Sequence, residues 1–173
     1  MNKKPLYTNE YIGHAGVKYL FEYFDSDHLD NLPIEKIKQC YAIAFYEDKF
    51  IVVNNKNKPN SYTPIGGGVD KDEKPEQTLI REIKEESNMK VLKYQLIGYQ
   101  KVVDTRGIEE DFYQLRYFAL VEPYGPFIQD PAGDVTEIVY CDKNNYKKYF
   151  DWGEIGDHII NRAYLIKAGF DSL

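Results

Sequence analysis

The chain has 173 residues, of which 43% are hydrophobic and 29% charged, an ordinary balance that is enough to bury one core. Its formal net charge of −6 argues against general binding to nucleic-acid backbones, because such binding depends on clustered Lys and Arg. An acidic protein still handles a polyphosphate when metal ions lie between its carboxylates and the phosphates. We therefore expect one domain that binds no nucleic-acid polymer.

The cysteines and the N-terminal segment predict a cytoplasmic protein. Cys40 and Cys141 lack the CxxC or Cys/His spacing of metal and redox sites, which indicates buried thiols in a reducing compartment. Residues 1–11 are polar and lack the apolar stretch of a secretory signal. Since no run approaches the roughly 20 apolar residues of a membrane span, we expect no membrane partner.

Hydrophobic patterning predicts an α/β domain in which strands alternate with a few helices. Residues 1–16 have few apolar side chains to anchor them, and residues 54–64, rich in Asn, Lys, Pro and Ser, are predicted as a loop. The run at residues 41–46 is apolar throughout, which predicts a central strand buried on both faces. Strands are predicted at residues 17–24, 41–46, 50–54, 91–103, 112–122 and 135–141.

The clearest predicted helix covers residues 74–88. Pro75 stands in its first turn, where a missing N–H group costs nothing, and apolar residues recur at helical spacing. Asn88 is predicted to end the helix in a left-handed conformation. Further helical segments are predicted at residues 33–38, 146–150 and 154–168, the last one docking onto the sheet.

Three acids share one face of this helix. Glu82, Glu85 and Glu86 stand at positions i, i+3 and i+4, where side chains are neighbours. Like charges so arranged weaken an isolated helix by about 0.2–0.5 kcal/mol per pair. A hard divalent cation reverses this effect, and Mg²⁺ prefers one or two carboxylates together with waters and phosphate oxygens. The helix is therefore predicted to be a platform for Mg²⁺.

The residues that precede the acids extend the pattern. Arg81 and Glu73 stand eight residues apart across the start of the helix, and we predict an ion pair between them. The three glycines at residues 66–68 allow the backbone to approach a metal or a phosphate closely. Together these residues predict metal-assisted phosphoryl chemistry, in which a metal orients a water and a carboxylate removes its proton.

Residues 67–89 resemble the Nudix box. The segment reads Gly67, five residues, Glu73, seven residues, and then Arg81-Glu82-Ile83-Lys84-Glu85-Glu86-Ser87-Asn88-Met89. Every specified position matches except the last glycine, where Asn88 stands, and Asn tolerates the left-handed conformation best after glycine. The resemblance implies a Nudix fold, which is a mixed β-sheet sandwiched between α-helices (α/β/α). It would be a single domain over residues 1–173 with an N-terminal extension of about 40 residues.

The resemblance also implies the roles of the box residues. Glu82, Glu85 and Glu86 would bind Mg²⁺ together with a backbone carbonyl near Gly67, and Mn²⁺ would be able to substitute. Arg81 and Glu73 would be the orienting ion pair. The predicted catalytic set is Glu82, Glu86, Glu137 and Arg81.

The catalytic base and the substrate contacts are less determined. Glu82 is one predicted base, but in some family members the base lies on a loop after the box. The loop candidates here are Glu109, Glu110, Asp111, Asp134 and Glu137, of which Glu137 is our first choice and Asp134 our second. Arg106, Arg116 and Asp134 are predicted as contacts to the substrate. The role of any of these residues depends on where the chain places it.

The box does not determine the group attached to the diphosphate. The size of the chain favours hydrolysis of a nucleoside triphosphate to a monophosphate and pyrophosphate by a metal-activated water. One alternative is an ADP-ribose or nucleotide-sugar pyrophosphatase, in which residues 1–40 would make room for a longer substrate through a homodimer interface. A second alternative is a non-catalytic nucleotide-binding sensor. In each case the expected partner is a nucleotide-type small molecule.

Overall fold

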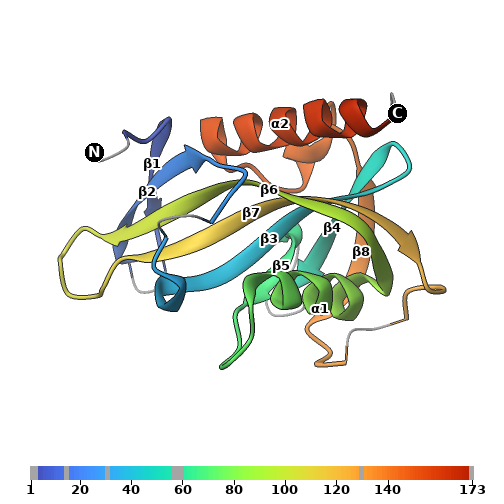
Figure 1. Ribbon diagram of the computed structural model, residues 1–173, viewed down its shortest axis with the longest axis horizontal. Coiled ribbons are helices and arrows are strands. Elements are labelled where there is room, and N and C mark those ends of the chain that lie inside the picture. The colour runs from blue at the N-terminus through green and yellow to red at the C-terminus, as the bar shows by residue number, and fades with distance from the viewer. Residues whose placement is uncertain (1–3, 14–15, 30–31, 56–60, 129–130, 172–173) are drawn as a thin grey trace.

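The structure is a computed structural model that describes residues 4–13, 16–29, 32–55, 61–128 and 131–171. Within these residues, eight strands form one sheet that lies between two long helices (Figure 1). The strands are β1 (Tyr7–Ile12), β2 (Lys18–Asp25), β3 (Ile37–Tyr46), β4 (Lys49–Asn55), β5 (Tyr62–Gly68), β6 (Met89–Asp104), β7 (Phe112–Pro123) and β8 (Val135–Cys141). The helices are α1 (Pro75–Ser87) and α2 (Gly153–Asp171), with short 3₁₀ helices η2 (Ile34–Lys36) and η3 (Tyr146–Lys148).

The sheet is mixed, in the order β1-β2-β6-β7-β3-β5-β4-β8. Neighbouring strands are antiparallel except for β3 and β7, which run parallel near the centre. Helices cover both faces there, so these two strands are buried on both sides, as the apolar run at residues 41–46 predicted. The expected α/β/α arrangement is confirmed.

Each helix covers its own hydrophobic core. Alternate residues of β3 point to opposite faces, so Ala42 and Ala44 lie in the core under α1, whereas Ile43 and Phe45 lie in the core under α2. Leu79 and Ile83 of α1 complete the first core, and Ile155, Ile159, Ile160 and Ala163 of α2 complete the second.

The two cysteines are free and buried, as predicted. Cys40 belongs to the core under α1 and Cys141 to the core under α2. Burial raises the pKa of each thiol to about 12. Both side chains therefore act as small hydrophobic residues.

Four segments differ from the sequence-based expectation. Residues 7–12 form β1, which main-chain pairing to β2 holds in place. Its side chains are mostly exposed, so its sequence lacks the apolar pattern that predicts a strand. The predicted loop at residues 54–64 gives way at residue 62 to β5, whose glycines obscure its strand character; residues 56–60 lie outside the described residues. The helices expected at residues 33–38 and 146–150 are only the short η2 and η3.

The N-terminal strands belong to the same sheet as the rest of the chain. β2 pairs with β6 over residues 19–25, and β1 pairs with β2 to end the sheet. The segment expected as an N-terminal extension therefore contributes the two strands at one edge of the sheet (Figure 1).

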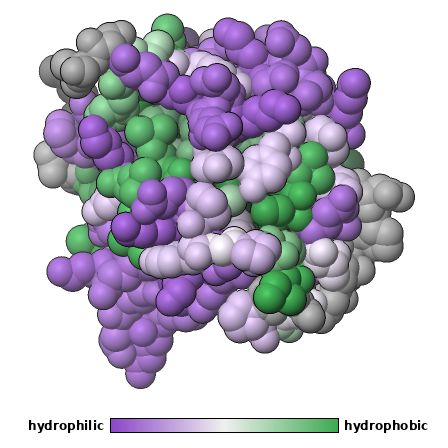
Figure 2. Space-filling view, turned by 90° about the vertical axis from the view of Figure 1, so that its right-hand side faces the viewer, coloured by the Kyte–Doolittle hydropathy of each residue, from purple (hydrophilic) through white to green (hydrophobic). Residues whose placement is uncertain are grey.

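Surface hydrophobic residues are scattered on the side of the molecule where α2 ends. Figure 2 shows them as separate patches between hydrophilic residues. Scattered exposure of this kind is ordinary for a protein surface. In the described part of the chain, no helix combines the length and apolar character needed to cross a membrane.

Candidate active site

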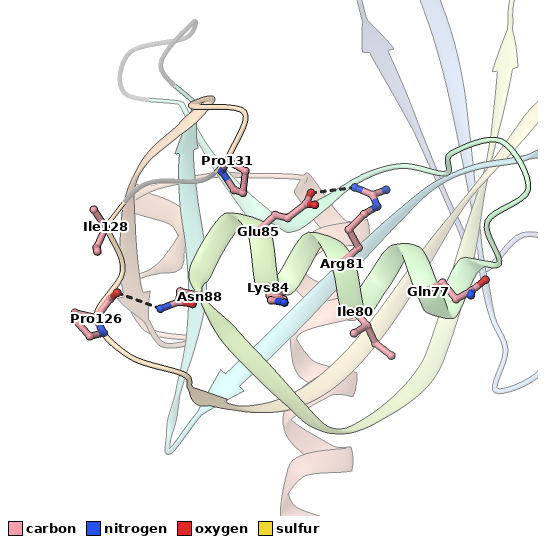
Figure 3. A pocket seen from close by; sticks show the side chains of 9 residues that line it. All are labelled: Gln77, Ile80, Arg81, Lys84, Glu85, Asn88, Pro126, Ile128 and Pro131. Atoms are coloured by element: carbon pink, nitrogen blue, oxygen red, sulfur yellow. Dashed lines mark hydrogen bonds and ion pairs between the residues drawn. The ribbon is translucent and has the colours of Figure 1, made fainter.

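Helix α1 begins and ends as its sequence predicts. Pro75 stands in the first turn, and the Gln77 side chain accepts a hydrogen bond from the Lys74 N–H group at 2.9 Å. Asn88 ends the helix with φ 54° and ψ 36°, in the left-handed region. Its side-chain Nδ2 also donates to the carbonyls of Gly125 and Pro126, at 3.2 and 3.1 Å, and Figure 3 shows the bond to Pro126. The residue that replaces the family glycine therefore ties the loop after β7 to the helix.

Two of the acids on α1 are held against the glycines of β5. The Gly66 N–H group donates to Oε2 of Glu86 at 2.9 Å. The Glu82 carboxylate lies on the α-carbon of Gly67, where a Cβ atom would stand 2.4 Å from Oε1. The glycines of β5 thus contact both carboxylates, and a side chain at residue 67 would displace the carboxylate of Glu82.

Arg81 connects the remaining parts of the box. Its Nε and Nη2 atoms donate to the two carboxylate oxygens of Glu73, each at 3.0 Å, in a bidentate pair. Nη2 also donates to the Gly68 carbonyl at 3.0 Å. Nη1 donates to Glu82 at 2.7 Å and to Glu85 at 3.3 Å. One guanidinium therefore orients the loop before α1 and two of the three acids.

Charge and burial give these carboxylates different proton affinities. The hydrogen bond from Arg81 is the main cause that lowers the pKa of Glu73 to about 2, and the Thr78 hydroxyl adds to it. Burial is the main cause that raises the pKa of Glu82, against the opposing effect of Arg81. Glu73 therefore stays ionised at working pH, whereas Glu82 has an increased affinity for a proton.

The donor set on α1 fits a hard divalent cation that shares its coordination with a substrate. Among the residues described, no group of three or more His, Cys, Asp or Glu is arranged to hold a metal ion by itself. Glu82 and Glu85 contact Arg81, and Glu86 contacts a backbone N–H group. Mg²⁺ binds through one or two carboxylates and fills its other positions with waters and phosphate oxygens. The site therefore suits an ion that arrives with a polyphosphate.

Glu137 lies apart from the acids of α1. It alternates along β8 with Val139 and Cys141, which pack in the core under α2, so the three share the opposite face of the sheet. The Tyr62 hydroxyl donates to its carboxylate at 2.8 Å. Asp134 is exposed just before β8. The structure does not bring Glu137 together with the box, and its role as base stays a prediction.

Arg106 is held in the loop between β6 and β7. Its Nε and Nη2 atoms donate to the Asp104 carboxylate at 2.9 and 3.0 Å. The backbone N–H group of Arg106 also donates to Oδ1 of Asp104. These bonds lower the pKa of Asp104 and shape the turn. Arg106 therefore stabilises the loop between β6 and β7, and its contact to a substrate stays a prediction.

Arg116 lies at a cavity of about 700 Å³ on the α2 face of the sheet. Its guanidinium carbon is 4.9 Å from the ring centroid of Tyr41 and 5.2 Å from that of Trp152. Tyr11 of β1 and Phe21 of β2 close another side, with their rings stacked at 5.2 Å. The polar lining at the floor includes Gln39, Gln100 and Gln114.

The sequence did not single out these glutamines. Each stands on a different strand, and their proximity follows from strand register, which local patterns do not encode. Arg116 was predicted only as a substrate contact, and its two aromatic neighbours, Tyr41 and Trp152, come from distant segments. A lone Arg among apolar strand residues was the one local signal.

The α2-face cavity and the acids of α1 lie on opposite faces of the sheet, and Tyr41 and Gly66 connect them. Tyr41, which lines the cavity, is paired with Gly66 in the β3–β5 register, and Gly66 binds Glu86. Burial raises the pKa of Tyr41, and the nearby charges of Glu86 and Glu82 raise it further. One residue of the cavity lining is therefore paired with the strand that binds a carboxylate of the box.

A second hollow of about 690 Å³ lies on the outer face of α1. Arg81 and Glu85 line it from the helix, and Pro126, Ile128 and Pro131 line it from the loop after β7 (Figure 3). Glu85 is thus accessible from this side, where a phosphate chain and its cation have room.

Comparisons with known proteins identify the family of the chain and its fold. The family model of the NUDIX domain matches residues 38–161. The pyrophosphohydrolase BsRppH of Bacillus subtilis, solved as a point mutant, superposes with a TM-score of 0.66 at 20% identity, covering 93% of this chain and 98% of its own. A NUDIX hydrolase from Nitrosomonas europaea gives a TM-score of 0.60 at 14% identity, covering 75% and 90%.

A C. elegans Ap4A hydrolase gives a TM-score of 0.56 at 17% identity, covering 77% of this chain and 98% of its own. No curated protein matches in sequence. The structural similarities confirm the expected fold, and the family model covers most of the chain and includes the whole box. The chain belongs to the Nudix hydrolase family, whose members cleave nucleoside diphosphate derivatives.

Proposed function

We propose that the chain hydrolyses a nucleoside triphosphate to a monophosphate and pyrophosphate, with Mg²⁺ as the cation and Mn²⁺ able to replace it. The observation that carries the proposal is the arrangement of Glu82, Glu85 and Glu86 on one face of α1. Arg81 or the glycine backbone of β5 holds each of them in place. Fixed carboxylates of this kind are suited to a metal-bound phosphate chain.

The residues of the site have different proposed roles. Glu82, Glu85 and Glu86 would hold the cation, which when bound polarises the phosphate and lowers the pKa of a water. Glu82 is also the proposed acceptor of the proton from the attacking water, because burial raises its pKa and Arg81 fixes its position. Arg81 acts as a positioning residue, since its donors are directed at Glu73, Glu82, Glu85 and the Gly68 carbonyl.

The cavity on the α2 face supports a nucleotide substrate. Its volume of about 700 Å³ lies within the range of roughly 300–1,000 Å³ typical of small-molecule sites. Aromatic side chains, which stack well on bases, line it, and one of them, Tyr41, is paired with Gly66, which binds Glu86. The phosphates of a nucleotide bound there would extend across β5 toward α1.

We also propose a cytoplasmic location and a homodimer. Two buried free thiols accord with a reducing compartment. β1 ends the sheet of the described residues, and an edge strand is suited to pairing with a second copy. Light scattering of the purified chain tests the dimer, and a single-copy mass would contradict it.

The experiment on function is a substrate panel assayed with Mg²⁺, with Mn²⁺ and with EDTA. The panel contains the nucleoside triphosphates, ADP-ribose, a nucleotide sugar and a dinucleoside polyphosphate. We expect a monophosphate and pyrophosphate from a triphosphate only when metal is present. Cleavage of ADP-ribose or the sugar nucleotide alone would identify a different substrate class, and binding without cleavage would identify a sensor.

Glu86→Gln provides the matched variant. The substitution keeps an oxygen that accepts from the Gly66 N–H group and removes the charge that would face the cation. We expect turnover to fall by several orders of magnitude while the protein stays folded. Glu122→Gln, an exposed acid on β7, is the control and should retain full activity. Full activity of Glu86→Gln in Mg²⁺ would contradict the proposed function.

A further inference from the structure

Three glutamines form a row across the floor of the α2-face cavity. Gln39 of β3 is paired with Gln114 of β7, which is paired in turn with Gln100 of β6. Gln100 Nε2 donates to Gln114 Oε1 at 3.1 Å, and Gln114 Nε2 donates to Gln39 Oε1. The three side-chain amides therefore form one chain of hydrogen bonds with a single direction.

Arg116 sets that direction. Its Nη2 atom donates to Gln114 Oε1 at 2.7 Å. A guanidinium only donates hydrogen bonds, so Gln114 must present its oxygen to Arg116 and its amide nitrogen to Gln39. A reversal of Gln114 would place two donors against each other, which a buried site resists.

The two ends of the row remain for a ligand. Gln100 Oε1 is an acceptor and Gln39 Nε2 is a donor, and neither has a partner within the described residues, although both side chains line the cavity. The row therefore offers one acceptor and one donor, in an order that Arg116 fixes.

Arg116 has no counterion among the residues that the structure describes. The residue is 4% exposed, and no carboxylate in the described residues lies within ion-pair distance. Its partners are the Leu115 carbonyl at 3.2 Å, Gln114 and two aromatic rings, while its Nε atom has none among the described residues. Burial lowers its pKa to about 10, so the group remains cationic at neutral pH. A buried cation of this kind favours a ligand atom that accepts hydrogen bonds.

We propose that the cavity holds the base of the substrate and selects a base in which a ring carbonyl adjoins a ring N–H group, as in guanine, hypoxanthine and uracil. This inference rests on the proposed function and names its substrate class. The carbonyl oxygen accepts from Arg116, and the ring N–H group donates to Gln100, since both side chains contact Gln114 Oε1. Arginine also pairs with the acceptors of guanine more often than with other bases.

Adenine and cytosine present the opposite pattern. Each has an amino group where the cavity requires an acceptor and a bare ring nitrogen where Gln100 requires a donor. Because Arg116 prevents the row from reversing, a mismatched base leaves buried groups unpaired. A mismatch in a polar pair typically costs about tenfold to a hundredfold in discrimination.

The first test is a comparison of kcat/KM for GTP, ITP and UTP with that for ATP and CTP at saturating Mg²⁺. We expect the first group to be preferred by about tenfold or more. Binding of the monophosphates, measured by calorimetry, gives the same comparison without turnover. Equal binding of GMP, IMP, UMP, AMP and CMP would overturn the selection. Selective binding with no cleavage of any triphosphate would instead contradict the proposed function and leave the selection standing.

Two variants test the residues. Gln100→Leu removes the acceptor and should weaken GMP binding about tenfold while AMP binding changes little. Arg116→Met removes the group that fixes the row and should bring GMP and AMP binding close together, with circular dichroism as the check on folding. Gln95→Leu, on the same strand but lining a different hollow, is the control and should change neither. Unchanged discrimination in a folded Gln100→Leu protein would overturn the proposal even if Arg116→Met fails to fold.

Discussion

The Glu82 carboxylate lies directly on the α-carbon of Gly67, so that a Cβ atom at residue 67 would stand 2.4 Å from Oε1. The neighbouring Gly68 has open space at the same position, with the nearest atom, the Lys38 carbonyl oxygen, at 3.9 Å. Two adjacent glycines of β5 therefore differ in what they permit. The first glycine of the box is required for the approach of an acid.

Gly67→Ala tests this contact against Gly68→Ala. The methyl group in Gly67→Ala should displace Glu82 and lower kcat about a hundredfold, because misplacement of a catalytic group by about 1 Å has this effect. Gly68→Ala should stay within a fewfold of the parent chain. Steady-state kinetics of both variants provide the measurement, and equal losses in the two would show that the contact with Glu82 is unimportant.

The identity of the base is tested by Glu82→Gln and Glu137→Gln. Glu82 is held beside the other acids of α1, whereas Glu137 faces the α2 side and binds Tyr62. We expect Glu82→Gln to lower kcat about 10²–10⁴-fold, the usual contribution of a general base. Glu137→Gln should change kcat less than about tenfold. If single-turnover rates gave the reverse order, the base would be Glu137, the first of the loop alternatives to Glu82.

The ion pair between Glu73 and Arg81 predicts that the stability of the protein depends on pH. The pKa of Glu73 is lowered from 4.5 to about 2 in the folded protein, so its contribution is present above the unfolded value and is lost as pH falls toward about 2. The Tm difference between the parent chain and Glu73→Gln should be largest near neutral pH and should shrink between about pH 4.5 and 2.

A thermal melt series over this pH range, with the exposed Glu122→Gln as control, checks this expectation. A difference between the parent chain and Glu73→Gln that grows on acidification would show that the ion pair does not supply the stability.

Asn88 gives a separate prediction on helix termination. The residue adopts φ 54°, which costs an ordinary L-residue about 1–2 kcal/mol. Asn88→Ala should therefore lower the free energy of unfolding in urea by about this amount. Asn88→Gly should lose less, because glycine adopts the conformation freely, although the bonds to Gly125 and Pro126 disappear. If the glycine variant were the less stable one, the loop contacts would outweigh the backbone conformation.

The sequence by itself determined the features that depend on local periodicity. The i, i+3, i+4 spacing of Glu82, Glu85 and Glu86 places them on one helix face in any fold, and Pro75 and Asn88 mark the ends of that helix. The apolar run at residues 41–46 likewise identified a strand buried on both sides. In each case the residues that determine the local structure lie within a few positions of one another in the sequence.

Only the tertiary structure decided which distant residues meet. The sequences of β1 and β5 do not have the apolar pattern of a strand. Pairing with β2 holds β1 in place, and glycines form much of β5. The row of Gln39, Gln114 and Gln100 and the surroundings of Arg116 exist only through the register of three strands. A shift of one residue in any of these strands would turn its side chains to the opposite face, and no local pattern specifies that register.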